Sequence, residues 1–384
     1  MNQIWKAIQL EEICDVEYGT RVVRKRDGGK GYPVYGGGGA TFEMDTFNRE
    51  GRLVIARFGM SAECTRFVSG QFFLNDSGLT VAPKNNLLIQ RFLDYQLLAL
   101  NDTIYGLGSG TAQKNLDVPA FRKMHIKFPE SLSEQQRIVR LLDEALEGIA
   151  IAKANAEKNL QNARALFESH LQSIFTKGGK GWADRPLIDL CSVFEDGDWI
   201  ESKDQSSGGI RLIQTGNVGK GMFKDRAGKA RFISESTFKT LRCTEIVSGD
   251  CLVSRLPDPV GRSCIIPSTT EKMITAVDCT ILRFKKDVLI PEYFVYYSQS
   301  SHYLSSIAKL CTGTTRNRIS RSNLGLTSVP VPSLTEQRKI IEVLMQIERQ
   351  TQALEASYLK KLTVLEEFSK SLLREAFAGA LKVA

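Results

Sequence analysis

The sequence predicts an α+β protein built twice on one plan, in which a globular domain is followed by a long helix. Three observations predict this class. A repeat of about 202 residues runs through the chain, each copy ends in a long heptad pattern, and many short apolar runs precede each heptad pattern. The 384 residues also exceed the length at which a single hydrophobic core stops growing, about 250 to 300 residues. We therefore expect two or more folding units.

The two helix starts carry the clearest part of the repeat. The segment Ser131-Leu-Ser-Glu-Gln-Gln-Arg-Ile138 returns as Ser333-Leu-Thr-Glu-Gln-Arg-Lys-Ile340, an offset of 202 residues. In both copies a serine stands three residues before a glutamate, which is the spacing of a capping box, and a proline lies just upstream. This pattern predicts that a helix begins at each segment.

Apolar residues continue from both starts with spacings that alternate between four and three, as in the seam of a coiled coil. The first set is Ile138, Leu142, Ala145, Ile149, Ala152, Ala156, Leu160 and Ala163. The second is Ile340, Leu344, Ile347, Leu354, Tyr358, Leu362 and Leu365, with Thr351 at the position that matches Ile149. Each pattern lasts about 42 residues, or roughly 63 Å of helix. If the helices pair antiparallel, a pseudo-two-fold axis relates the two copies.

The segments before the helices repeat more faintly, in the same order. Gly51-Arg-Leu-Val-Ile-Ala-Arg57 resembles Gly249-Asp-Cys-Leu-Val-Ser-Arg255, and both predict a turn that leads into an apolar strand. Residues 89–100 and 290–301 predict short helices with aromatic faces. The offset drifts from 177 to 203, so the second copy carries an insertion, mainly between residues 191 and 249.

These boundaries divide the chain into four parts. They are domain 1 (residues 1–130), a central long helix (131–176), domain 2 (177–332), and a C-terminal long helix with its tail (333–384). The fold class is therefore two globular α+β domains separated by two long helices, which form an antiparallel coiled coil with pseudo-two-fold symmetry.

Charge separates the domains from the helices. The net charge of +8 divides into +2 for domain 1, −1 for the central helix, +6 for domain 2 and +1 for the last part. Because the excess lies in the domains, we expect a polyanion such as double-stranded DNA to bind there rather than along the helices. The candidate contact residues lie in glycine-rich or polar loops, where cations can reach phosphates and base edges. They are Arg21, Arg24, Lys25, Arg26, Lys30, Gly110, Thr111, Lys114, Lys220, Lys224, Arg226, Gly313, Thr314, Arg316, Arg318 and Arg321.

Catalytic and metal-binding motifs are missing from the sequence. It contains no phosphate-binding Gly-x-x-x-x-Gly-Lys-Ser/Thr and no dinucleotide fingerprint, and its three histidines have no ligand at metal-binding spacing. The eight cysteines form no Cys-x-x-Cys pair, so we expect core cysteines in a reducing cytoplasm. No apolar run approaches the roughly 18 to 20 residues that cross a bilayer, and the N-terminus lacks a signal-peptide pattern. The chain is thus predicted to be cytoplasmic and non-catalytic, with neither a catalytic residue nor a metal site.

The helix starts, each preceded by a variable domain, resemble those of the specificity subunit of type I restriction-modification enzymes. Tyr32-Pro-Val-Tyr-Gly-Gly-Gly-Gly39 resembles one common form of that family's target-recognition domain, and Ile210-Arg-Leu-Ile-Gln-Thr-Gly-Asn-Val218 resembles another. Residues 110–116 and 313–319 resemble the loop that closes each such domain. The resemblance covers almost the whole chain, and the helix starts are its most specific part.

This resemblance implies that each domain reads one half of a bipartite, asymmetric DNA site. It also implies that the two helices set the spacing and dock modification (methyltransferase) subunits, two in number, with motor-nuclease restriction subunits completing the complex. S-adenosylmethionine then belongs to the methyltransferase partners, and this chain needs no cofactor of its own. The bases recognised and the length of the spacer stay open.

Two other function classes stay open at this point. The chain could be a nuclease or another metal enzyme that uses Asp or Cys residues, which magnesium-dependent cleavage by the purified chain would reveal. It could also be a coiled-coil scaffold for protein partners, in which case DNA affinity would be weak and independent of sequence.

Overall fold

The computed structural model describes residues 5–313 and 317–378 and has the expected α+β class. The chain forms two compact units. One contains the residues up to 157 together with those from 359 onward, and the other contains residues 158–358. Each unit thus holds one domain and a section of both long helices, α6 (Leu132–Lys177) and α11 (Leu334–Phe377). Within the described residues, no helix is long and apolar enough to span a lipid bilayer.

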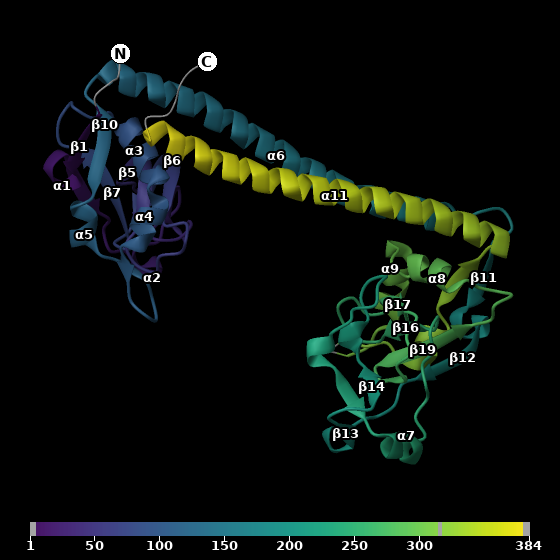
Figure 1. Ribbon diagram of the computed structural model, residues 1–384. Helices are drawn as coiled ribbons and strands as arrows, with labels where there is room; N and C mark the ends of the chain where they lie inside the picture. The colour runs from purple at the N-terminus through teal and green to yellow at the C-terminus, as the bar shows by residue number, and fades with distance from the viewer. Residues whose placement is uncertain (1–4, 314–316, 379–384) are drawn as a thin grey trace. The chain divides into compact units, whose positions relative to one another are not determined.

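Domain 1 is built on a six-stranded sheet in the order β2-β7-β5-β6-β3-β4 (Figure 1). Its strands are β2 (Cys14–Tyr18), β3 (Tyr32–Tyr35), β4 (Glu43–Met44), β5 (Arg49–Ala56), β6 (Thr65–Leu74) and β7 (Gly78–Pro83). Outside it, β1 (Trp5–Gln9) pairs with β10 (His125–Pro129), and β8 (Gly108–Ser109) pairs with β9 (Asn115–Leu116). The helices are α1 (Leu10–Ile13), α2 (Arg24–Asp27), α3 (Gln90–Ala99), α4 (Asn101–Gly106) and α5 (Val118–Arg122).

The core of domain 1 includes both long helices. Phe92 and Leu93 of α3 are fully buried in one cluster with Leu53 and Ile55 of β5. The same cluster contains Ile138 and Leu142 from the start of α6, and Leu373 and Ala376 from the end of α11. The long helices are therefore part of this folding unit rather than a linker attached to it.

Domain 2 contains two four-stranded sheets, ordered β12-β19-β16-β17 and β13-β15-β14-β18. Their strands are β12 (Cys191–Asp196), β13 (Gln205–Ser206), β14 (Ile210–Ile213), β15 (Arg231–Ile233), β16 (Cys251–Ser254), β17 (Ser263–Ile265), β18 (Met273–Thr275) and β19 (Cys279–Phe284). A further pair joins β11 (Ala183–Pro186) to β20 (Ser328–Val331). The insertion expected between residues 191 and 249 forms β13, β14, β15 and α7 (Glu235–Leu241), which supply most of the second sheet.

One predicted helix of domain 2 is shorter than expected. The pattern over residues 290–301 predicts a single helix, but α8 (Pro291–Tyr297) ends early and α9 (Ser301–Leu310) follows. The side chain of Ser300 accepts a hydrogen bond from the Tyr303 backbone N–H, which caps α9 as a separate helix. A last short helix is α10 (Arg321–Gly325). Tyr297 and Tyr303 are buried against each other in the core of this domain.

A buried glutamine fastens each long helix to its domain. The Gln135 side-chain amide donates to the carbonyls of Leu87 and Pro129, both at 2.9 Å, and its Oε1 accepts from the Ile89 backbone N–H at 2.9 Å. At the 202-residue offset, Gln337 makes the same three bonds, to Val288, Pro332 and Ile290, again at 2.9 Å. Both glutamines have no exposed surface. The repeated letters at the helix starts thus mark a repeated attachment of helix to domain.

The two long helices pack antiparallel, as predicted (Figure 1). In one unit Lys153 of α6 lies 4.0 Å from Glu366 of α11, and in the other Arg164 lies 3.1 Å from Glu355. The repeat offset places Lys153 level with Glu355 and Arg164 level with Glu366, so the two ion pairs are equivalent. The helices have 46 and 44 residues, slightly more than the heptad pattern covers.

The predicted seam is correct except near the middle of α11. Ile149, Ala156 and Leu160 are buried in α6, and so are Leu344 and Thr351 in α11. Leu354 is 42% exposed and does not belong to the seam. The residue after it, Glu355, reaches across to Arg164 and contributes a polar contact at that level instead.

Gly51 also differs from its predicted role. It lies inside β5 with φ of +54°, where the register against β6 shifts between Glu50 and Arg52, so it forms a bulge rather than a turn before the strand. Gly249 has φ of +87° and precedes β16, as expected. At the helix starts the serines act as predicted, because Ser131 Oγ accepts from Glu134 N at 3.4 Å and Ser333 Oγ from Glu336 N at 3.3 Å.

Candidate nucleic-acid interface

One loop closes each domain in the same way. The loop at residues 110–116 is bound to the end of β5 because Leu116 N donates to Arg57 O at 2.9 Å. In domain 2, Ile319 N donates to Arg255 O at 3.3 Å. Gly110 and Gly313 both have φ of +114°, a conformation that favours glycine. The predicted correspondence of the two closing loops is therefore visible in the backbone.

The glycine run of domain 1 begins where neighbouring segments approach closely enough to require glycine. A Cβ atom on Gly36 would lie 2.1 Å from Ser77 Oγ, and one on Gly37 would lie 2.6 Å from Phe58 O. The next two glycines of the run, Gly38 and Gly39, are exposed with nothing within 4 Å of such an atom. The first half of this run is thus packed on the domain, while the second half is exposed, and the Gly38 carbonyl accepts a hydrogen bond from the Arg66 guanidinium.

The basic cluster of domain 1 lies on and beside the one-turn helix α2. Arg21, Arg24, Lys25 and Arg26 are all exposed. Arg26 makes a two-nitrogen contact with Asp27, from Nε at 2.8 Å and from Nη2 at 3.0 Å, and this pairing raises the pKa of the guanidinium. The cluster therefore offers three cations for which no ion pair is recorded within the described residues, and one whose charge is balanced.

The remaining candidates of domain 1 sit near its closing loop and its first hairpin. Lys30 is exposed, and its backbone N–H is held by Asp45 at 2.8 Å. Thr111 is exposed at the tip of the closing loop. The Lys114 ammonium lies 3.6 Å from the centroid of the Tyr105 ring, a cation–π contact. The contact with Asp45 thus positions the backbone of Lys30, and the contact with Tyr105 positions the ammonium group of Lys114.

In domain 2 the candidates of the 220–231 stretch lie on a hairpin-like loop. Asn217 closes it, since its side-chain amide donates to Lys224 O at 2.9 Å. Lys220 is near the tip, 3.8 Å from Glu168 of α6, and Lys224 stands exposed at the base. Arg226 lines a hollow of about 420 Å³ together with Gln214, Asn217, Lys229, Ala230 and Arg231. Among the described residues, the lining of this hollow contains three cationic side chains and no carboxylate.

The last group of candidates belongs to the closing loop of domain 2. Arg318 is exposed, and its Nη2 lies 2.9 Å from Asp278 Oδ1. Arg321 is exposed at the first position of α10. Thr314 and Arg316 lie outside the described residues.

Two buried arginines, whose roles the sequence pattern does not reveal, shape these loops. Arg262 is 8% exposed and donates to the carbonyls of Thr215, Val218, Leu256 and Pro259 at 2.6 to 3.0 Å. Burial lowers the pKa of its guanidinium. Because these carbonyls come from the two loops at residues 215–218 and 256–259, Arg262 holds one loop against the other.

The second arginine directly follows the strand β16. Arg255 is 4% exposed, pairs with Asp196 at 3.0 Å, and donates to Val277 O at 2.6 Å and to Ile319 O at 3.4 Å. Its own backbone O is the acceptor that binds the closing loop. Arg255 thus connects β12, the turn before β19 and the closing loop.

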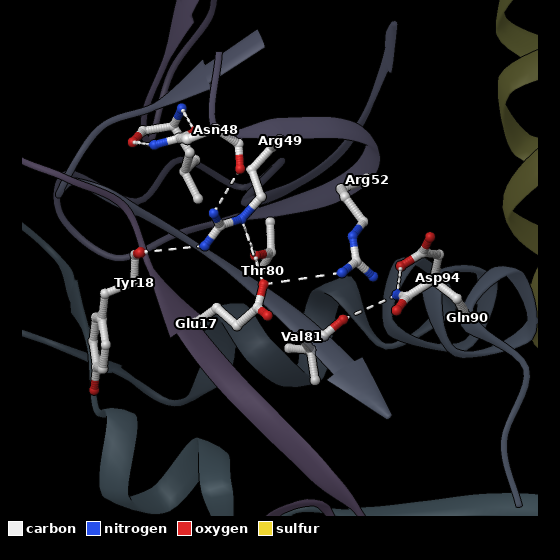
Figure 2. A network of polar contacts seen from close by, with 10 residues as sticks. Glu17, Tyr18, Asn48, Arg49, Arg52, Thr80, Val81, Gln90 and Asp94 are labelled. Atoms are coloured by element: carbon white, nitrogen blue, oxygen red, sulfur yellow. Dashed lines mark hydrogen bonds and ion pairs between the residues drawn. The ribbon is translucent and has the colours of Figure 1, made fainter. Parts of the chain in front are cut away.

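Domain 1 contains a comparable polar network inside its sheet (Figure 2). Arg49 Nε donates to Thr80 Oγ1 at 2.9 Å, and Thr80 Oγ1 donates in turn to Glu17 Oε2 at 3.0 Å. On α3, Asp94 is 4% exposed and accepts from Gln90 at 2.9 Å. Burial raises the pKa of the Asp94 carboxyl to about 6. This network joins β2, β5 and β7 and acts on the stability of the domain rather than on its surface.

Seven of the eight cysteines are buried, as predicted for core residues. Burial raises the pKa of the thiols of Cys14, Cys191, Cys264 and Cys279 to about 12, so these thiols stay protonated and poorly nucleophilic.

The family of the chain follows from comparison with known proteins. The type I restriction modification DNA specificity domain matches residues 2–162 and again residues 179–364. The chain therefore belongs to this family of DNA specificity subunits, and its two copies of the domain are the two halves of the repeat. The specificity subunit of the type I restriction enzyme MjaVIII from Methanocaldococcus jannaschii is 20% identical over 339 residues, covering 82% of this chain and 77% of the relative.

Solved structures show the same fold. A chain from a study of complex assembly and conformational transition in a type I restriction-modification system matches with a TM-score of 0.73 at 20% identity, over 98% of both chains. The HsdS subunit from Thermoanaerobacter tengcongensis matches with a TM-score of 0.59 at 18% identity, over 98% of this chain and 97% of that one. The predicted fold class of two α+β domains and two long helices is confirmed.

Proposed function

We propose that this chain is the non-catalytic DNA-reading subunit of a type I restriction-modification complex, with each domain reading one half of a bipartite, asymmetric site. The observation that carries the proposal is the repeated closing loop, bound to Arg57 O in one domain and to Arg255 O in the other, with exposed cations beside it. The domains differ in sequence and in their loops, so the two half-sites should differ. The sixteen candidate residues are the proposed contacts with double-stranded DNA.

The long helices set the separation of the two half-sites and dock two modification subunits. The support for this role is that residues of both long helices belong to the core of each domain, so each domain is attached to the helices by its core. The modification subunits supply S-adenosylmethionine and methylate adenine, and this chain contributes no cofactor. Motor-nuclease restriction subunits complete the complex. The proposed location is the cytoplasm, without a membrane partner.

The test is an exchange of domain 1. Residues 1–130 are replaced by those of a relative with a different target, the chain is expressed with its modification subunits, and methylated adenines are mapped across the host DNA. One half-site should change while the other half-site stays the same. A change in both halves, or in neither, would contradict the proposal. So would magnesium-dependent cleavage of DNA by the purified chain alone.

A further inference from the structure

Among the exposed cations, Arg318 differs in having a fixed position. It is bridged to Thr312 by two backbone hydrogen bonds, Thr312 N to Arg318 O at 2.9 Å and Arg318 N to Thr312 O at 3.0 Å. The next residue, Ile319, is fully buried and bound to Arg255 O. The side chain therefore starts from a backbone that is anchored on both sides, although 45% of the side chain is exposed.

Its guanidinium is also held by an acid. Arg318 Nη2 lies 2.9 Å from Asp278 Oδ1, and the Asp278 side chain is 29% exposed. Asp278 itself is positioned by its backbone, because its carbonyl accepts from Arg255 N at 2.9 Å and the preceding carbonyl, of Val277, accepts from the Arg255 guanidinium. The contact is an ion pair rather than a hydrogen bond, because Asp278 Oδ1 is buried and has no hydrogen-bond partner among the described residues. A guanidinium carries five N–H donors.

This arrangement favours a base edge over a phosphate. The adjacent carboxylate cancels most of the net charge that would attract a phosphate, and it repels one that approaches. It leaves the planar donor edge intact, and guanine offers two acceptors, O6 and N7, in the geometry that such an edge fits. A carboxylate that fixes the guanidinium also lowers the entropy cost of that recognition.

The other acid-paired arginine among the exposed candidates has donors occupied by its acid. Arg26 uses both Nε and Nη2 on Asp27. For Arg24, Lys224 and Arg321, no ion pair is recorded within the described residues, which is the situation expected of phosphate contacts.

The equivalent position in domain 1 has no cation. Leu116 corresponds to Ile319 by its bond to the strand end, so Asn115 corresponds to Arg318. The Asn115 side chain is occupied locally, since its Oδ1 accepts from Gly59 N at 3.2 Å. The two domains therefore present different side chains to DNA at this position, an asparagine in domain 1 and an arginine in domain 2.

We infer that Arg318 reads a guanine in the half-site contacted by domain 2, with Asp278 as its positioning residue. The inference rests on the proposed function, and it separates base contacts from phosphate contacts among the candidates. Arg318→Ala and Arg318→Lys should both lose the preference for guanine at one position of one half-site, by roughly 5- to 140-fold. Lysine keeps the charge but not the planar fork, so it should not rescue.

The experiment uses the full chain assembled with its modification subunits and a randomised duplex library. The enriched duplex is then measured by equilibrium binding against single-base substitutions and over a range of salt. Asp278→Asn should weaken the same preference while raising affinity for unrelated duplexes. Arg321→Ala is the matched control, and it should lower affinity evenly over sequences and make the salt slope shallower by about 0.9.

Melting of each variant complex shows whether folding is retained. The inference is overturned if Arg318→Ala behaves like the Arg321→Ala control, if Arg318→Lys restores the preference, or if Arg318→Ala changes nothing. A different result marks failure of the proposed function itself: the wild-type complex then enriches no sequence at all, before any variant is compared.

Discussion

The attachment of the long helix to domain 1 can be tested with Gln135→Ala. The Gln135 side chain is fully buried and makes three hydrogen bonds to the backbone, two as donor and one as acceptor. The substitution removes these bonds and leaves the Ile89 N–H without its acceptor. A hydrogen bond contributes about 1 kcal/mol net, and a buried group left unpaired costs about 1 to 3 kcal/mol, so the loss should be about 3 to 5 kcal/mol. That is a large part of a typical stability of roughly 5 to 15 kcal/mol.

Two measurements check this. Urea denaturation gives the change in the free energy of unfolding, and hydrogen exchange of the peptide that contains Ile89 shows whether its amide loses protection. The matched control is Gln136→Ala, because Gln136 is the neighbouring glutamine and is exposed, so its loss should stay within about 0.5 kcal/mol. If both variants unfold at the same urea concentration, the buried hydrogen bonds do not stabilise the attachment and the reasoning is wrong.

Three further predictions concern charge. Because burial raises the pKa of Asp94 to about 6, the folded state holds a proton there more tightly than the unfolded chain and loses stability as pH rises through the interval from about 4 to 6. Relative to Asp94→Asn, the wild-type free energy of unfolding should fall by about 3 kcal/mol over that interval in urea titrations, and parallel pH curves would contradict this. Arg262→Ala should destabilise domain 2 by about 3 to 5 kcal/mol in thermal unfolding, since four carbonyls lose their donor, and an unchanged melting curve would refute that role. Lys25→Ala should weaken binding evenly across duplexes and reduce the salt slope by about 0.9, whereas a loss at a single base position would assign Lys25 to readout.

Much of the fold could be predicted because it follows from the spacing of residues that are close in sequence. The heptad spacing predicts both long helices, and the repeated helix starts predict equivalent attachments. The errors have two different causes, a contact with the other long helix in one case and a local helix cap in the other. Leu354 fits the apolar spacing, but Glu355 contacts Arg164 there, and residues 290–301 look helical throughout although Ser300 caps a new helix.

The candidate site was predictable only in part. Clusters of exposed cations on loops are visible as runs of letters, and the described members lie exposed or partly exposed as such runs suggest. Which cation has an acid beside it was not predictable, because Asp278 and Arg318 are 40 positions apart. The role of Arg262 could not be predicted for a different reason. Its partners are backbone carbonyls, which every residue carries, so no pattern of side chains in the sequence indicates these contacts.

The two equivalent ion pairs of the coiled coil distinguish the helices from each other. An apolar seam that repeats at 202 residues would allow two copies of the first helix, from two molecules, to pair as well as the first helix pairs with the second. The charges oppose this. The first helix places cations at both positions, Lys153 and Arg164, and the second places carboxylates at both, Glu355 and Glu366. Two first helices would bring Lys153 against Arg164, so repulsion between like charges opposes the pairing of two first helices, whereas a first and a second helix carry opposite charges at both levels.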